Sequence, residues 1–463
     1  MSPELISILA LMAMFVIATL LPINIGILAF VGAFVLGLTL TDMDGETILE
    51  DGFPDELAVT LIGITLLFAM ARNNGTIDWL LALAVRAVRG RLVAIPWVMF
   101  AITGVLTAFG AVSPAAVAII APVALGFAYR FQINPMLMGI MVVHGAQAGG
   151  FSPISIYGTI TNQVVERANL EGSPLTLFLA SLFFNLGIAI VGFFIFGGRS
   201  LLSRRTHELE GSEQGGTEPS GAAASRAETR EAGAAGTEQA GPGTTAGGTA
   251  TSTATSTTTE ATNLTPTLYQ LVTLVGLLGL AVGTLFYELD VGLTALTVAL
   301  VLALISPQSQ KSAIQHVSWS VVLLIGGVLT YVFVLEELGT VEYAGNAVVA
   351  VGAALLAAML LCYVGGIVSA FASSTALLPF IIPLAVPLLE QGGLGAVGMV
   401  SALAVSSTVV DVSPFSTNGA IVLANSAEDD QDHIYRMLLI FGFSVVAIAP
   451  AVAWAVMIAP GWL

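Results

Sequence analysis

The chain has 463 residues, of which 56% are apolar and only 9% are charged, whereas about 25% of residues are charged in ordinary soluble domains. This composition excludes a water-soluble globule. Cys362 is the only cysteine, which excludes an intrachain disulfide, a thiolate-bound zinc and an iron–sulfur cluster. The net charge of −17, with Lys311 as the only lysine, argues against nucleic acid as a partner.

Apolar runs long enough to cross a bilayer as helices follow one another along the first part of the chain. The run 114–128 would be only about 22 Å long as a helix, so together with 92–109 it predicts a re-entrant hairpin. The run from Pro135 to Val165 is too long for one crossing and contains GGFSPIS near its middle, which predicts a broken helix. The other predicted elements are helices over 4–21, 23–40, 57–72 and 174–198, and an interfacial amphipathic segment that carries Arg86 and Arg89.

A stretch rich in Gly, Ala, Thr, Ser and Glu, residues 199–266, separates two parts of nearly equal length, 1–198 and 267–463. Its composition predicts a disordered linker. The two parts match in order at a nearly constant offset, which indicates an internal duplication. The matching blocks are NIGI at 24–27 with DVGL at 290–293, GTIDW at 75–79 with GTVEY at 339–343, Ala108-Phe109 with Ala370-Phe371, and SPISIYGTI at 152–160 with SPFSTNGAI at 413–421.

The second part predicts the same series of elements, and each part makes an odd number of net crossings. Repeats with an odd number of crossings must be inverted. The predicted fold class is therefore an all-α polytopic membrane protein of two inverted repeats, each with five transmembrane helices, a re-entrant helical hairpin and one broken helix. The predicted helices of the second part cover residues 267–287, 291–306, 319–335, 346–371, 376–389, 394–425 and 434–459.

The positions of the basic residues predict the orientation, because basic loops lie inside. Placing both termini outside puts Arg130, Arg199 and Lys311 inside and the acidic loop from Asp42 to Glu56 outside. The linker is then cytoplasmic. The chain is expected to be a multi-pass protein of the inner or plasma membrane, with the lipid bilayer as its surroundings.

Four irregular places are expected at membrane depth, namely two hairpin tips and two helix breaks. Irregular backbone is tolerated there only when it is buried in protein or lines a cavity, and a half-helix that begins at a break offers free N–H groups to an anion. The alternative is that small polar residues only permit close packing. The candidate substrate-binding residues are Ser113, Ser152, Ser155, Thr159, Asn162, Ser373, Ser374, Thr375, Ser413, Ser416, Thr417 and Asn418.

No lysine or arginine lies in these four places, so a dianion there would need accompanying cations. Asp411 lies within an apolar run and is a candidate cation ligand or proton carrier, its alternative role being a helix cap. His144 is a second candidate for coupling, although a hydrogen-bonded packing role is favoured. No cofactor other than a co-transported cation is expected.

The stretch from Glu4 to about Asn162 contains LPINIGILAF, NNGTIDWL, IPWVMF, GAVSPAAVAIIAP and HGAQAGGFSPISIYGTI, and it resembles the N-terminal region of MatC-type malonate and dicarboxylate carriers. More distantly, the whole chain is similar to the divalent anion/sodium symporter branch of the ion transporter superfamily. That resemblance implies inverted repeats, two re-entrant hairpins, two broken helices and elevator-like movement. It also implies sodium ions near Ser113 and Gly150 and near Ser373 and Asp411. Residues 373–375 with Pro383 resemble the hairpin motif Ser-Asn-Thr of that family, with Ser for Asn, while 112–114 depart from it more.

The residues and the resemblance together imply a secondary transporter, not an enzyme, for small di- or polyanionic carboxylates such as malonate or C4-dicarboxylates, driven by a sodium or proton gradient. One alternative is a sodium/proton or oxyanion antiporter of the same superfamily, although a cation antiporter should carry several intramembrane carboxylates and only Asp411 stands out. A membrane enzyme or receptor would need a soluble domain or a nucleophile paired with a base. The sequence leaves open the carboxylate, the coupling cation, the direction of transport and whether the protein forms a homodimer.

Overall fold

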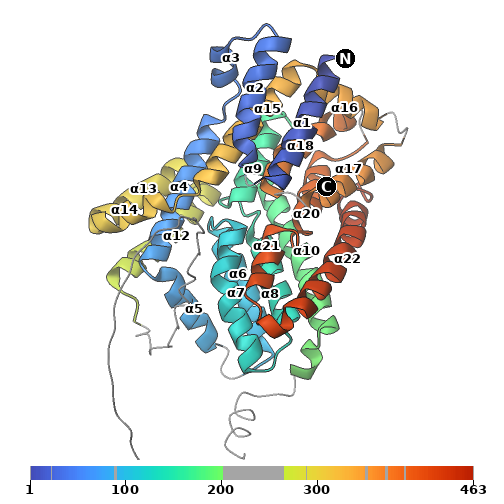
Figure 1. Cartoon of the computed structure of the whole chain (residues 1–463). Coiled ribbons are helices and arrows are strands. Elements are labelled where there is room, and N and C mark those ends of the chain that lie inside the picture. Colours follow the sequence, from blue (N-terminus) through green and yellow to red (C-terminus); the bar gives the residue numbers. More distant parts are fainter. Residues whose placement is uncertain are drawn as a thin grey trace, which may run out of the picture.

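The computed structural model describes residues 2–21, 23–87, 91–201, 265–287, 289–349, 353–370, 374–390 and 393–461. Their regular structure is helical, and the helices pack side by side into one bundle (Figure 1). Most of the predicted linker, residues 202–264, lies outside this described part of the chain, as do Arg89 and Ser373.

The helices of the first half follow the predicted order. The break predicted within 135–165 is confirmed, because residues 150–155 are not helical. The predicted run 114–128 is too short, since the helix extends from Ser113 to Arg130. The elements are α1 (Pro3–Leu20), α2 (Ile25–Leu40), α3 (Gly45–Glu50), α4 (Asp55–Asn73), α5 (Thr76–Ala87), α6 (Ala94–Ala108), α7 (Ser113–Arg130), α8 (Pro135–Gly149), α9 (Ile156–Arg167), α10 (Pro174–Ile195) and η1 (Gly198–Leu201).

The second half repeats this order with one correction. The single helix predicted over 346–371 is wrong, because one helix ends at Val349 and another begins at Ala354, after the extended backbone of Ala353. The apolar composition of this segment gave no sign that it holds two helices. The elements are α12 (Leu268–Tyr287), α13 (Val291–Ile305), α14 (Pro307–Gln315), α15 (Trp319–Glu337), α16 (Thr340–Val349), α17 (Ala354–Ser369), α18 (Ser374–Ile381), η2 (Pro383–Ala385), α19 (Val386–Glu390), α20 (Ala396–Thr408), α21 (Thr417–Ala424), η3 (Glu428–Asp430) and α22 (Gln431–Met457).

The apolar outer surface identifies a multi-pass membrane protein. Within the described residues, five helices are long and apolar enough to cross a membrane, and shorter apolar helices accompany them. Large apolar side chains such as Ile195, Phe286 and Leu304 are exposed by 65%, 77% and 75%. Such side chains are stable on a surface that faces lipid rather than water.

Contacts between the two halves are reciprocal. By order in the two halves, α2 corresponds to α13 and α4 corresponds to α15. Helix α2 packs on α15, and α4 packs on α13. Two further sets of contacts have the same relation. Helix α1 packs on α16 as its counterpart α12 packs on α5, and α7 packs on α21 as its counterpart α18 packs on α9. Equivalent elements of the two halves therefore meet each other in equivalent ways.

Glycines allow two of these helix pairs to touch backbone to backbone. A Cβ atom on Gly327 of α15 would lie 1.9 Å from the carbonyl oxygen of Gly26 on α2. In the reciprocal pair, a Cβ atom on Gly63 of α4 would lie 2.7 Å from the carbonyl oxygen of Gly292 on α13. Small residues permit such close approach between helices in membranes, and these crossings fasten the first half to the second.

Helices α8 and α20 form the centre of the molecule. Every residue of α8 from Met136 to Gly149 is buried, and so is every residue of α20 from Gly398 to Thr408. Each of these helices leads directly into a helix break, so both breaks begin deep inside the protein. Polar groups at the breaks are thereby removed from the surrounding lipid.

Candidate substrate and cation site

Serine caps determine where the half-helices after the two breaks begin. The hydroxyl of Ser155 accepts a hydrogen bond from the backbone N–H of Gly158 at 3.3 Å, and that of Ser416 accepts one from the N–H of Gly419 at 3.4 Å. Serine is a preferred residue at this position because it satisfies an N–H that has no partner within the helix. A Cβ atom on Gly158 would lie 2.0 Å from the carbonyl oxygen of Ser152, so the fold of the first break requires glycine there.

The first serine of each break ties it to the end of a neighbouring helix. The Ser152 hydroxyl donates to the carbonyl of Ala108, at the end of α6. Its counterpart Ser413 donates to the carbonyl of Ala370, directly after α17, at 3.1 Å. Both hydroxyls therefore donate their hydrogen to a backbone carbonyl of the protein. These bonds hold the first break against the residues before α7 and the second break against the residue after α17.

Four buried polar side chains form the central cluster, defined here as Ser113, Gln147, Asp411 and Asn418. The Asn418 amide donates to Asp411 Oδ2 and to the Ser113 hydroxyl, both at 2.8 Å. The Gln147 amide donates to Asp411 Oδ2 at 3.1 Å. Asp411 is 6% exposed, Ser113 is 3% exposed and the two amides are fully buried. The cluster joins both halves, because Ser113 and Gln147 belong to the first and Asp411 and Asn418 to the second.

The central cluster contains acceptor oxygens that lack a donor. Among the described residues, Gln147 Oε1 and Asn418 Oδ1 are buried and have no hydrogen-bond partner. A buried acceptor without a partner costs about 1–3 kcal/mol, so a ligand that supplies positive charge or a donor would be stabilised there. The described residues hold no group of three or more His, Cys, Asp and Glu side chains that could bind a transition metal.

Tyr157 connects the central cluster to the second half. Its hydroxyl interacts with Thr375, Ser113 and Gln147, and the residue is 4% exposed. Tyr157 follows the first break at the position where Asn418 follows the second. Neither Tyr157 nor Gln147 is among the sequence-predicted candidates, although the offset that pairs Ser152 with Ser413 also pairs Tyr157 with Asn418.

The remaining predicted binding residues are not all in the central cluster. The Ser374 hydroxyl is hydrogen-bonded to Ser369 at 2.8 Å, and Thr159 donates to the carbonyl of Ser155 at 2.8 Å. Asn162 is half-buried, and Thr417 is exposed. Ser373 lies outside the described residues. The structure thus brings Ser113, Asp411 and Asn418 together, with Thr375 and Ser416 beside them.

His144 lies apart from the central cluster, on α8, and its side chain contacts α10. Its Nδ1 is 2.9 Å from Asn185 Oδ1, and its ring packs edge-on against Phe441 with centroids 6.0 Å apart. Asn185 also donates to the Ser181 hydroxyl at 3.3 Å, and Ser181 donates to the Gln147 carbonyl at 3.0 Å. His144 therefore belongs to a network that supports the backbone of Gln147.

Comparison with known proteins adds a finding about the first third of the chain. No curated protein matches the chain. Residues 1–150 match a family model described as the N-terminus of the dicarboxylate carrier protein MatC. They include α8, which supplies Gln147, and the start of α7, which supplies Ser113. The chain is a multi-pass membrane protein. Over residues 1–150 it is similar to a carrier family and not to an enzyme family.

Proposed function

We propose that the protein is a secondary carrier that moves small dicarboxylates across the membrane together with a cation. The observation that carries this proposal is the central cluster, where one buried carboxylate and three neutral polar side chains from both halves meet inside a membrane protein. The similarity of residues 1–150 to a dicarboxylate carrier supports the choice of substrate class.

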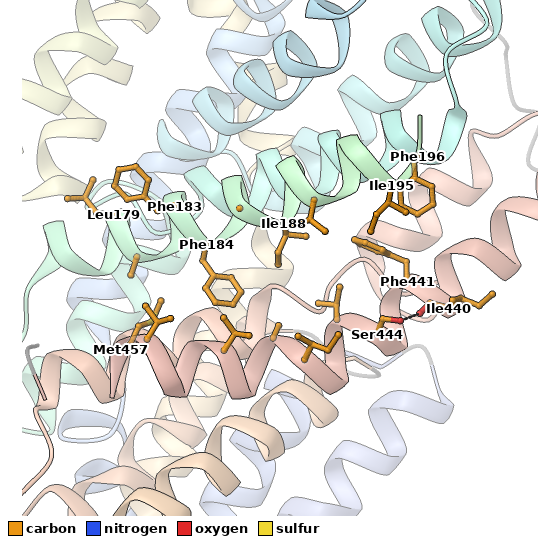
Figure 2. A pocket seen from close by; sticks show the side chains of 18 of the residues that line it. Leu179, Phe183, Phe184, Ile188, Ile195, Phe196, Ile440, Phe441, Ser444 and Met457 are labelled. Carbon is orange, nitrogen blue, oxygen red and sulfur yellow. Dashed lines mark hydrogen bonds between the residues drawn. The ribbon is translucent and has the colours of Figure 1, made fainter. Parts of the chain in front are cut away.

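The proposed architecture is a pair of inverted repeats, each with a re-entrant hairpin. The reciprocal helix contacts support this arrangement. So do the equivalent helices α10 and α22, which lie antiparallel: Phe196 at the end of α10 packs on Phe441 near the start of α22, with centroids 5.8 Å apart (Figure 2). Equivalent helices that run in opposite directions are expected when one repeat is inverted relative to the other.

The proposed substrate position lies between the tips and breaks of the two halves. The Tyr157, Thr375 and Ser113 hydroxyls lie around it. These groups donate hydrogen bonds, and the N-termini of α9 and α21 add partial positive charge. A dicarboxylate has two anionic ends, so it would use donors from both halves, whereas a monocarboxylate would use only one set.

The proposed cation position is beside Asp411. Its carboxylate, the two unpartnered amide oxygens of Gln147 and Asn418, and the Ser113 hydroxyl supply the neutral and anionic oxygen ligands that hard cations prefer. A cation there would offset the charge of Asp411 and lower the cost of placing an anionic substrate nearby. A proton on Asp411 would do the same, so both sodium and proton coupling use this residue.

Uptake by the purified full-length chain in proteoliposomes tests the proposal. We expect labelled malonate or a C4-dicarboxylate to accumulate under an imposed sodium or proton gradient, with lactate competing poorly. Asp411→Asn keeps the size of the side chain but removes its charge, so gradient-driven accumulation should be lost while exchange of internal for external dicarboxylate persists. Sodium/proton exchange without any dicarboxylate uptake would instead identify an antiporter.

A further inference from the structure

A long apolar groove runs between α10 and α22, the last helices of the two halves (Figure 2). The cavity has a volume of about 1010 Å³. Of the described residues that line it, only Thr176 and Ser444 are polar, and the Ser444 hydroxyl donates to the carbonyl of Ile440 at 2.7 Å. The groove therefore offers almost nothing to water and is suited to an apolar ligand.

The length of the groove equals the thickness of the membrane interior. Its lining extends from Thr176 to Phe196 on α10 and from Met437 to Met457 on α22, about 30 Å on each helix at 1.5 Å per residue. The hydrocarbon core of a bilayer is also about 30 Å thick. Lining side chains such as Phe183 and Ile440 are 62% and 63% exposed, so the groove is open to its surroundings along one side.

The shape of the groove favours an acyl chain as its occupant. The groove follows two helices over their full apolar length and is open along one side. A flexible chain of methylene groups can follow such an irregular apolar channel and contact the side chains that line it.

Polar residues at one end of the groove define where a lipid headgroup would lie. A second pocket, of about 430 Å³, shares Phe196 with the groove and is lined by Ser200, Asp430 and His433 among others. Arg436 is exposed on α22 between His433 and the groove residue Ile440.

The charges around this pocket have both signs. Arg199 is exposed next to Ser200, while the acidic residues Glu428, Asp429 and Asp432 are exposed around half-buried Asp430. A purely anionic headgroup would meet repulsion from these carboxylates, and a purely cationic one from the arginines. A zwitterionic headgroup can place each charge next to its opposite.

We propose that the α10–α22 groove is a binding site for a zwitterionic phospholipid such as phosphatidylethanolamine. Its acyl chains fill the groove, its phosphate lies near Arg436 and its amine lies near Asp430. Phe441 packs on Phe196 and also on His144, so a bound lipid supports the helix α8 that carries Gln147. This site goes beyond the proposed carrier function and does not depend on it.

The test uses the full-length protein in nanodiscs with a phosphatidylethanolamine that carries a photoreactive group on its acyl chain. Label should map to peptides of α10 and α22. Val191 lines the groove and Ile190, its neighbour, does not, and both are exposed. Val191→Trp should lower labelling of these peptides by about fivefold or more by filling the groove, while Ile190→Trp should leave it unchanged.

A second experiment tests the assignment of the lipid headgroup. Phosphatidylglycerol with the same photoreactive chain should label the groove more weakly than phosphatidylethanolamine, and Asp430→Asn should remove this preference. Labelling of other lipid-facing helices is the internal reference for each variant. Equal labelling of the two tryptophan variants, equal labelling by the two lipids, or efficient cross-linking of two copies through Val191→Cys would overturn the proposal.

Discussion

Asn418 and Thr417 are adjacent in the chain but have opposite surroundings, which provides a matched pair of variants. Asn418→Ala removes the amide that donates to both Asp411 and Ser113, whereas Thr417 is exposed. Hydrogen bonds to charged groups are worth about 1.5–3 kcal/mol, so loss of the bond to Asp411 should disturb the proposed cation position and weaken the cation-coupled apparent affinity for dicarboxylate by about 10- to 150-fold. Thr417→Ala should change it little. Initial uptake rates over a range of malonate concentrations measure both.

The position of a serine in the sequence did not determine what its hydroxyl binds. Ser152, Ser155, Ser413 and Ser416 were predicted as substrate ligands, yet each hydroxyl is bonded to backbone near its own break. Motif spacing places such residues at a break, but the partner depends on which carbonyl the tertiary fold brings near. Tyr157 was missed for the converse reason: an aromatic side chain in an apolar run looks like core, although its hydroxyl faces Thr375.

Asp411 shows what sequence can establish at this scale. A lone carboxylate in an apolar run must be paired or functional inside a membrane, and the structure pairs it with two amides. The amide from α8 could not be foreseen, because Gln147 comes from the other half of the chain. The sequence therefore identifies the charged member of the central cluster, and the fold supplies the neutral members.

The close contact between α2 and α15 at Gly26 and Gly327 leads to a prediction about stability. Gly327→Ala would place a methyl group 1.9 Å from the Gly26 carbonyl oxygen, so the helices must move apart. Gly279→Ala on α12 is the matched control, since nothing lies within 4 Å of its added methyl group. Overpacking costs about 1–3 kcal/mol, whereas alanine favours a helix over glycine by about 1 kcal/mol.

Cys362 supplies the measurement for both glycine variants, because it is the only cysteine and is fully buried. A thiol-reactive fluorophore added to the purified protein should therefore report unfolding as temperature rises. We expect the midpoint to fall for Gly327→Ala and to stay or rise for Gly279→Ala. A Gly327→Ala protein as stable as the parent would show that α2 and α15 are not in backbone contact.

Most elements could be predicted to within a few residues, because apolar runs bounded by Gly, Pro and polar residues mark helices clearly in a membrane protein. The exceptions have physical causes. Helices α3 and α14 are short and partly polar, so no apolar run in the sequence indicated a helix there. The boundary between α16 and α17 lies in an unbroken apolar sequence, where hydropathy does not mark the end of a helix.

The orientation in the membrane can be tested on the whole molecule. In a Cys362→Ala background, Glu46→Cys on α3 should react with a membrane-impermeant maleimide added to intact cells, and Arg130→Cys at the end of α7 should react only after permeabilisation. Both side chains are exposed, and the expectation follows from basic residues lying inside. The opposite pattern would reverse the assigned topology while leaving the central cluster intact.

The order of the helices was the most predictable property of the whole molecule. The matched sequence blocks anticipated that the helices of the second half would follow in the order of the first, and the structure has that order. How the halves join could not be foreseen, because the glycine crossings and the central cluster unite residues that are far apart in the chain.

The serine tethers at the breaks have a mechanical consequence. Ser152 holds the first break to the end of α6, and Ser413 holds the second break to the residue after α17. We expect each break to move together with the helix end to which its serine is bonded, since separating them would leave a buried carbonyl without a hydrogen-bond partner at a cost of about 1–3 kcal/mol.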